Sequence, residues 1–141
     1  MRKKIIAGNW KMNKNPEETK VFFNSFNELV KDCDNEIIIC TPFINLDNAK
    51  QSAANKISIG AQNMHFEDKG AYTGEVSGKM LKDININYVI IGHSERRQYF
   101  AETDETVNKK IKSALAVGLK PIVCVGETLE QRESGVTEQI I

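Results

Sequence analysis

Polar side chains that could bind a small molecule stand directly after several short apolar runs of the sequence. Asn9 and Lys11 follow the first run, Gln62 follows the third, and His93 follows the fourth. If these runs are parallel strands, their carboxyl ends meet at one edge of the sheet, where α/β proteins build their sites. One cation, two amides and one imidazole at that edge predict a site for an anionic, oxygen-rich small molecule.

The residues around His93 bear on its charge state. Ser94 is a good N-cap residue, so we expect a short helix to begin beside the ring. The positive end of that helix would disfavour an imidazolium and keep the ring neutral. Each residue also has an ordinary interpretation: Lys11 as a surface lysine, Asn9 as a turn residue, His93 as a structural histidine, and Glu95 as a first-turn acid.

The elements that must position these side chains are five short strands separated by amphipathic stretches. Continuous apolar runs predict strands, and caps or apolar positions at helical spacing predict helices. The expected strands are residues 5–7, 36–40, 56–61, 88–91 and 121–125. The expected helices are 15–30, 46–54, one turn near 80–81, 103–118, and one that begins at Thr128.

Two of the helices have predicted buried faces and caps. Asn15 as cap, Pro16 at the first position and Glu18 in a capping box begin the first long helix. The apolar face expected on that helix is Phe22, Phe26, Leu29 and Val30. On the helix that ends near Gly118, the expected buried face is Val107, Ile111, Ala114 and Leu115.

Strand and helix alternate along the chain, which predicts an α/β protein with parallel strands and right-handed crossovers. Two architectures fit this order, a doubly wound open sheet and a (β/α)8 barrel, and periodicity does not choose between them. A complete barrel typically has about 250 residues, whereas this chain has 141. Residues 1–141 contain no linker-like segment, so we expect them to belong to one domain. The polar, glycine-rich stretch 63–77 is predicted to be a functional loop.

Composition excludes several classes of partner and cofactor. The 19 basic and 19 acidic side chains give a formal net charge of zero, which offers no reason to expect nucleic acid or an anionic membrane. The three cysteines form no CxxC pair or zinc pattern, so we expect no metal and a reducing cytoplasm. The stretch from Gly74 to Lys79 is not a phosphate-binding Walker motif, because it is one residue too short and Met80 follows it.

Five motifs, in order along the chain, carry a resemblance to a known family. They are Ala7–Asn13 (AGNWKMN), Gly60–Asn63 (GAQN), Gly70–Glu75 (GAYTGE), Gly92–Arg97 (GHSERR) and Cys124–Thr128 (CVGET). Together they resemble triosephosphate isomerase over essentially all 141 residues. The resemblance implies a TIM barrel that interconverts dihydroxyacetone phosphate and glyceraldehyde 3-phosphate through an enediolate, in glycolysis and gluconeogenesis. It implies neither a cofactor nor a metal.

The resemblance also implies roles for individual residues. Asn9 and Lys11 would hold the phosphorylated triose, and Glu95 would steady the Lys11 ammonium. His93 would be the neutral electrophile that polarises the carbonyl and moves a proton. The family works as a homodimer, and Tyr72, Thr73, Gly74 and Glu75 resemble the loop that inserts into the neighbouring subunit.

One part of the family pattern is missing from this sequence. In the family the glutamate base follows the sixth strand, and the phosphate loops follow the seventh and eighth. The chain is therefore expected to be the N-terminal part of a barrel, strands one to five, and to be inactive alone. Two rival interpretations stay open: a barrel enzyme with Lys11 as a Schiff-base nucleophile, and a folding or assembly unit that binds anions without turnover.

Overall fold

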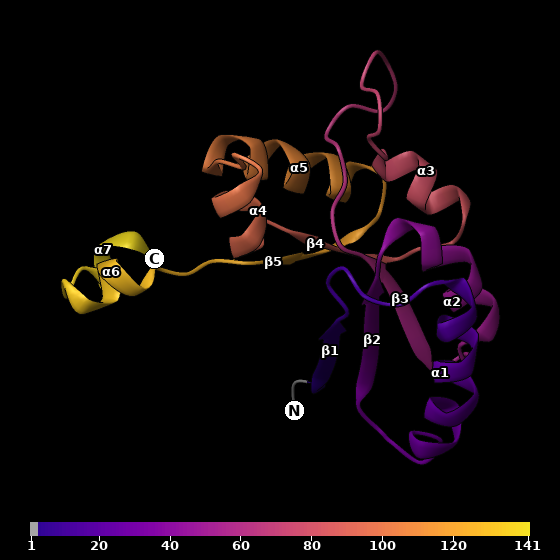
Figure 1. Cartoon of the computed structure of the whole chain (residues 1–141). Coiled ribbons are helices and arrows are strands. Elements are labelled where there is room, and N and C mark those ends of the chain that lie inside the picture. The colour runs from indigo at the N-terminus through magenta and orange to yellow at the C-terminus, as the bar shows by residue number, and fades with distance from the viewer. Residues whose placement is uncertain (1–2) are drawn as a thin grey trace.

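The computed structural model of the chain describes residues 3–141 and contains a parallel sheet with helices between its strands (Figure 1). The strands are β1 (Ile5–Asn9), β2 (Glu36–Thr41), β3 (Ile57–Ala61), β4 (Tyr88–Ile91) and β5 (Lys120–Val123). The helices are α1 (Pro16–Leu29), η1 (Phe43–Asn45), α2 (Leu46–Ser52), α3 (Gly78–Asp83), α4 (Ser94–Tyr99), α5 (Asp104–Ala116), α6 (Leu129–Glu133) and α7 (Thr137–Ile140).

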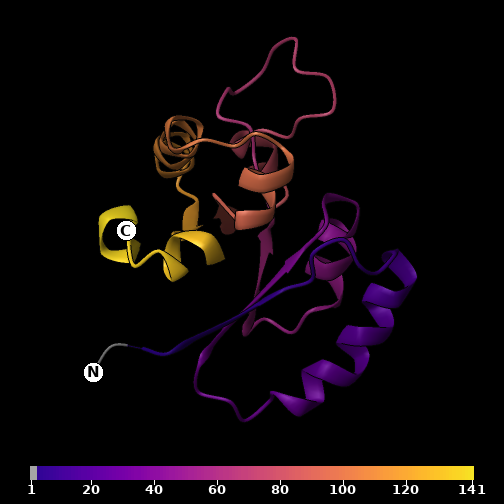
Figure 2. The same ribbon diagram turned by 60° about the vertical axis from the view of Figure 1, so that its left-hand side comes forward.

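The order of the strands decides between the two architectures that the sequence left open. The sheet runs β1-β2-β3-β4-β5, and every strand is parallel to the next. A doubly wound sheet reverses its strand order and carries helices on both faces. Here the order never reverses, and α1, α2, α3 and α5 all lie on the convex side of a curled sheet (Figures 1 and 2). The fold is therefore a partial (β/α)8 barrel with five strands.

Apolar side chains form a separate cluster on each face of the sheet. The larger cluster lies between the sheet and the helices and includes Phe23, Ile39 and Leu81. The smaller one occupies the concave face, where Cys40 from β2 meets Tyr88 from β4, with Ile38 and Ile90 beside them. A layer built by alternate strands is the packing found inside TIM barrels, so the concave face is a section of barrel interior.

Gly60 allows β2 and β4 to approach each other across β3. A Cβ atom at this position would lie 2.7 Å from Cys40 Sγ and 3.2 Å from Tyr88 Cβ. Both distances are shorter than ordinary van der Waals contact. The missing side chain on β3 therefore makes room for the inner cluster and allows the sheet to curl.

Replacing Gly60 with alanine is expected to lower the free energy of unfolding by about 1–3 kcal/mol, because the new methyl group overpacks the inner cluster. Gly126→Ala is the matched control, since a Cβ there meets no atom within 4 Å. Adding Cys40→Ala to Gly60→Ala should recover part of the loss. Urea unfolding of the parent chain and the three variants measures the effect. Equal stability of Gly60→Ala and Gly126→Ala would contradict this explanation of the curled sheet.

The first long helix confirms its predicted start and three of the four residues of its predicted face, since Phe22, Phe26 and Val30 pack against the core. The Asn15 side chain accepts a hydrogen bond from Glu18 N, and the Glu18 side chain completes the capping box. Phe23 is fully buried, whereas Leu29 is 81% exposed. Apolar residues on α1 spread over two adjoining faces, and only the face toward Trp10 and α2 is covered by the described residues. The prediction that Leu29 is buried was therefore wrong.

The helix α5 shows a similar difference. Val107 and Ala114 are buried as predicted, but Leu115 is 60% exposed. Lys110, which lies on the same face as Val107 and Ala114, takes a buried position instead. The packed face is rotated toward a polar network at the site, which an apolar pattern does not reveal.

The strand limits differ slightly from those predicted. β1 extends to Asn9, two residues past the predicted end, whereas β5 ends at Val123 instead of residue 125. β1 is an edge strand with Ile5 and Ile6 more than half exposed, so it is not buried on both faces among the described residues.

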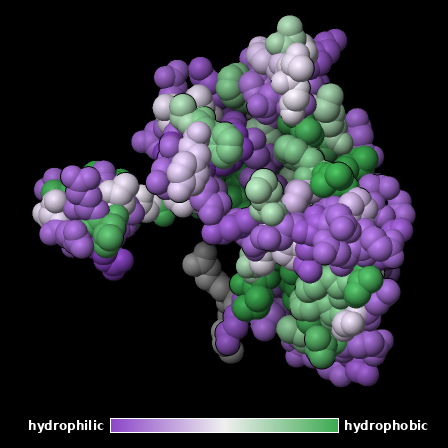
Figure 3. All heavy atoms as spheres, in the orientation of Figure 1, coloured by the Kyte–Doolittle hydropathy of each residue, from purple (hydrophilic) through white to green (hydrophobic). Residues whose placement is uncertain are grey.

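Apolar atoms are visible on the surface in the lower half of the molecule, which holds α1 (Figure 3). Within residues 3–141, no helix combines the length and apolarity needed to cross a membrane.

Candidate active site

A pocket of about 270 Å³ lies at the carboxyl ends of β1, β2, β3 and β4. Its polar lining comes from the ends of β1, β3 and β4 and the segments that follow them. Asn9, Lys11, Gln62, Asn63, His93, Glu95 and Arg96 contribute to it. The structure thus brings together the four residues proposed as catalytic or substrate-binding, Asn9, Lys11, His93 and Glu95, around one space.

Lys11 is held at its backbone and at its ammonium group. Its backbone φ is 52°, in the left-handed region, and its N–H donates to Asn9 Oδ1 at 2.9 Å. Its Nζ lies 2.7 Å from Glu95 Oε1. The hydrogen bond from Lys11 lowers the pKa of Glu95, and the charge of Lys11 adds to this effect. Glu95 is therefore ionised at neutral pH.

This pairing bears on the Schiff-base alternative. A lysine that acts as a nucleophile needs a desolvated or cation-flanked amine that loses its proton easily. The Lys11 side chain is 55% exposed and paired with a carboxylate. Lys11 is thus neither desolvated nor flanked by a cation, so the site supports non-covalent chemistry at Lys11.

His93 takes the cap position of α4 itself. Its Nδ1 accepts the backbone N–H of Glu95 at 3.2 Å, so His93 and not Ser94 is the N-cap. The prediction of Ser94 as the cap was wrong by one residue, because an imidazole can take the acceptor role of a hydroxyl. The Glu95 carboxylate is 3.5 Å from the same nitrogen. Since the backbone amide of Glu95 donates to the Nδ1 lone pair, Nε2 is the ring nitrogen that can carry the donor hydrogen.

The backbone before His93 is fixed by a glycine turn. Gly92 has φ 77°, and its carbonyl accepts a hydrogen bond from Arg97 Nε at 2.9 Å. Arg97 also pairs with Asp104 at 2.6 Å. Arg97 is therefore engaged in holding the turn between β4 and α4.

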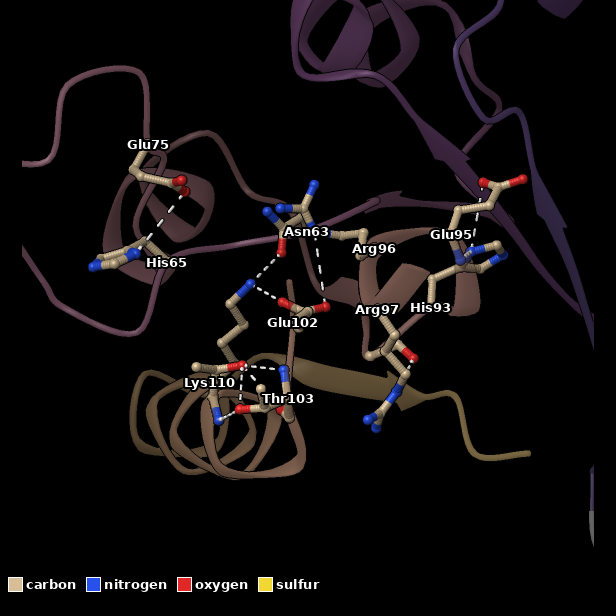
Figure 4. A network of polar contacts seen from close by, with 12 residues as sticks. Asn63, His65, Glu75, His93, Glu95, Arg96, Arg97, Glu102, Thr103 and Lys110 are labelled. Atoms are coloured by element: carbon tan, nitrogen blue, oxygen red, sulfur yellow. Dashed lines mark hydrogen bonds and ion pairs between the residues drawn. The ribbon is translucent and has the colours of Figure 1, made fainter. Parts of the chain in front are cut away.

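A buried polar network behind the pocket was not found from the sequence. Lys110 Nζ donates to Asn63 Oδ1 at 2.8 Å and to the Glu102 carboxylate, as the close view shows (Figure 4). Glu102 also forms an ion pair with Arg96, with 3.8 Å between Arg96 Nε and Glu102 Oε2. Lys110 and Glu102 are both at least nine-tenths buried. The network joins α5 to α4 and to the loop after β3, and so supports two walls of the pocket.

The proposed interface loop lies away from this pocket. Tyr72, Thr73, Gly74 and Glu75 are exposed, and they belong to the long loop that projects beyond α3 (Figure 1). Within the loop, the His65 ring stacks on Phe66 and lies tilted against Tyr72, with ring centroids 4.4 Å and 4.3 Å apart. The loop is therefore packed against itself, and its tip does not line the pocket.

Cys40 and Cys124 do not supply a nucleophile to the site. Burial, with the neighbouring Cys124 adding to it, raises the pKa of Cys40 to about 12. Burial also raises the pKa of Cys124, against the opposing charge of Arg97. Both side chains stay as thiols at neutral pH, and the thiolate is the reactive form. Among residues 3–141, no group of three or more His, Cys, Asp or Glu side chains is arranged to hold a metal ion.

Comparison with known proteins gives the family. The model of the triosephosphate isomerase family matches residues 4–141. The chain belongs to this family. The Alkaliphilus metalliredigens triosephosphate isomerase is 58% identical over 142 aligned positions, which cover 100% of this chain and 57% of that protein. The Acetivibrio thermocellus triosephosphate isomerase is 56% identical over 141 positions, covering 99% of this chain and 56% of that protein.

A third relative shows the same extent of overlap. The Clostridium perfringens strain 13 triosephosphate isomerase is 55% identical over 142 positions, again 100% of this chain and 57% of the relative. The chain therefore spans somewhat more than half the length of the triosephosphate isomerases that it matches.

Proposed function

We propose that this chain supplies the first five βα units of a triosephosphate isomerase, which interconverts dihydroxyacetone phosphate and glyceraldehyde 3-phosphate. The observation that carries the proposal is the joint placement on one pocket of Lys11, which pairs with Glu95, and His93, whose Nδ1 accepts a backbone N–H. An enediolate intermediate develops negative charge on oxygen. A fixed ammonium and a neutral N–H donor are the groups that stabilise such charge without losing their own protons irreversibly.

In the proposed mechanism each residue has a separate task. His93 Nε2–H donates to the substrate carbonyl oxygen and passes its proton as the enediolate forms. The Lys11 ammonium, held by Glu95, faces the phosphate and the developing oxyanion. Asn9 uses its Oδ1 to hold the Lys11 backbone, which leaves its NH2 group to donate to the substrate.

The reaction also needs a base that removes a proton from the substrate carbon, and we propose that residues 1–141 do not supply one. Glu95 is the one carboxylate lining the pocket among the described residues, and it is paired with Lys11. Glu127 follows β5, but its carboxylate contacts Thr137 and Arg132 instead. We therefore expect the 141-residue chain to show no turnover alone.

A chimera tests the proposal. In it, this chain replaces the matching N-terminal part of the Alkaliphilus metalliredigens relative, and the remainder of that relative completes the barrel. Produced in a host that lacks its own isomerase, the chimera is expected to isomerise glyceraldehyde 3-phosphate, whereas the 141-residue chain alone should not. A folded chimera without activity would overturn the assignment of function, and turnover by the short chain would overturn the account of the missing base.

Two further parts of the proposal concern assembly and location. We propose that the loop containing Tyr72, Thr73, Gly74 and Glu75 contacts a second copy of the complete protein, because its exposed, internally packed tip presents a ready contact surface. We propose the cytoplasm as the compartment, since Cys33, Cys40 and Cys124 are free thiols. Sedimentation of the chimera, with and without a Tyr72→Asp change, tests whether this loop contacts a second copy.

A further inference from the structure

We propose that Gln62 and Asn45 are positioning residues that hold the backbone of the loop carrying Lys11. The inference rests on the proposed function and extends it to two side chains that need not touch the substrate. Gln62 comes from the loop after β3 and Asn45 from η1, and both reach the loop after β1.

The loop after β1 has an unusual backbone. Among the described residues, four that are not glycine have positive φ, and two of them are Lys11 at 52° and Lys14 at 69°. Residues with a side chain disfavour this region, and it persists where surrounding contacts over-determine it. Two left-handed residues three positions apart therefore call for contacts that hold them.

Each of these two residues has its carbonyl held by a side-chain amide from a distant part of the chain. Gln62 Nε2 donates to Lys11 O at 2.9 Å, and Asn45 Nδ2 donates to Lys14 O at 2.7 Å. The contacts link positions 51 and 31 residues apart in the sequence. At both positions, therefore, a left-handed backbone coincides with a carbonyl held by a side-chain amide.

Gln62 uses both hydrogens of its amide on backbone oxygens. Besides Lys11 O, its Nε2 donates to Cys40 O at 3.0 Å. The Cys40 carbonyl also accepts Trp10 N at 3.0 Å, which extends the pairing of β1 with β2. Since an amide nitrogen has two hydrogens, Gln62 has no N–H left for a ligand. The sequence placed Gln62 among the groups that bind the anion, and the structure assigns its donors to the backbone instead.

Asn45 is fully buried, and its Oδ1 has no hydrogen-bond partner. A buried polar atom without a partner costs free energy. The hydrogen bond that the Asn45 side chain does make is the one to Lys14 O. An apolar side chain at this position would avoid the cost of the unpaired oxygen. We infer that the hydrogen bond to the Lys11 loop offsets that cost.

The two amides complete the fixation of Lys11. Glu95 holds the ammonium, and the amides hold the backbone on either side of residues 12 and 13. If the amides are lost, the backbone at Lys11 can relax to negative φ, which redirects its side chain away from Glu95. Displacement of a catalytic group by about 1 Å can cost a hundredfold in rate.

Gln62→Glu and Asn45→Asp test this in the chimera, because each keeps the shape of the side chain but replaces the N–H donor with an oxygen. We expect each to lower kcat/KM by about tenfold to a hundredfold. Asn24→Asp, on the exposed face of α1, adds the same charge and should leave kcat/KM unchanged. In a Lys11→Met background neither change should lower activity further. A full additional loss there would overturn the proposal, since it would show action independent of Lys11.

A second readout does not depend on activity. In the 141-residue chain, NMR chemical shifts of the Lys11 and Lys14 carbonyl and Cα carbons report the left-handed backbone. We expect Gln62→Glu to shift Lys11 toward ordinary values and Asn45→Asp to shift Lys14, with Asn24→Asp changing neither. Unchanged chemical shifts would overturn the proposal that the two amides hold the backbone at Lys11 and Lys14. An inactive parent chimera would count against the proposed function alone, because the shifts still decide the role of the amides.

Discussion

Replacing Lys11 with methionine is expected to lower kcat/KM of the chimera by about a hundredfold to a thousandfold, the usual effect of removing one charge-stabilising group from an active site. Methionine keeps the length of the side chain but removes the positive charge that faces the pocket. Stability should change little, because an exposed ion pair such as Lys11 with Glu95 contributes about 0–1 kcal/mol. Steady-state kinetics and urea unfolding of the same preparation separate the two effects.

Lys14→Met is the matched control for this change. Lys14 belongs to the same loop and also has a left-handed backbone, but it does not line the pocket. Its Nζ lies 5.4 Å from the centres of the Trp10 and Phe22 rings, so its charge is engaged elsewhere. We expect near-normal kcat/KM from this variant. Equal losses from the two substitutions would mean that the loop, and not the Lys11 charge, accounts for the effect.

Replacing Lys110 with methionine is expected to have the largest effect on stability, a loss of about 3–5 kcal/mol in the free energy of unfolding. Lys110 is buried and donates to Glu102 and Asn63. Without the ammonium, the buried Glu102 carboxylate keeps only the longer ion pair with Arg96. A carboxylate that is buried without an adequate partner is costly, because protein atoms do not replace the water that it loses.

Lys112→Met provides the comparison on the same helix. Lys112 is exposed on α5, so this substitution should change the free energy of unfolding by no more than about 0.5 kcal/mol. A double replacement, Lys110→Met with Glu102→Gln, should be less destabilised than Lys110→Met alone, because it removes the unpaired charge. If Lys110→Met were as mild as Lys112→Met, Glu102 would not depend on Lys110 for its partner.

Much of the fold follows from local signals in the sequence. The cap at Asn15, the proline at position 16 and the turn at Gly118 are set by neighbouring backbone groups, so short-range rules predicted them. The choice between barrel and open sheet depended instead on which strands meet. That is decided by contacts such as Gly60 against Cys40, which link residues distant in the sequence and leave no local pattern.

The same contrast between local signals and long-range contacts applies to the site. Asn9, Lys11, His93 and Glu95 were predicted for the site because each follows a strand and belongs to a recognisable motif, and the structure places all four on one pocket. Lys110 and Glu102 were missed because a buried ion pair looks, in sequence, like two ordinary surface charges of a helix and a loop. One signal was available: Lys110 lies three residues after Val107 and four before Ala114, on the buried face. A lysine inside an apolar stripe indicates a buried partner.

The unbroken strand order, β1 to β5, also bears on how the chain can fold during its synthesis. Every strand pairs with the one made immediately before it, so each new segment leaving the ribosome finds its partner already present. The β3–β4 step differs, because only Gly60 with Tyr88 and Ala61 with Val89 form its register, across the long loop after β3. Assembly can therefore proceed from the N-terminus in one direction, with the docking of β4 as the step that has the fewest contacts to guide it.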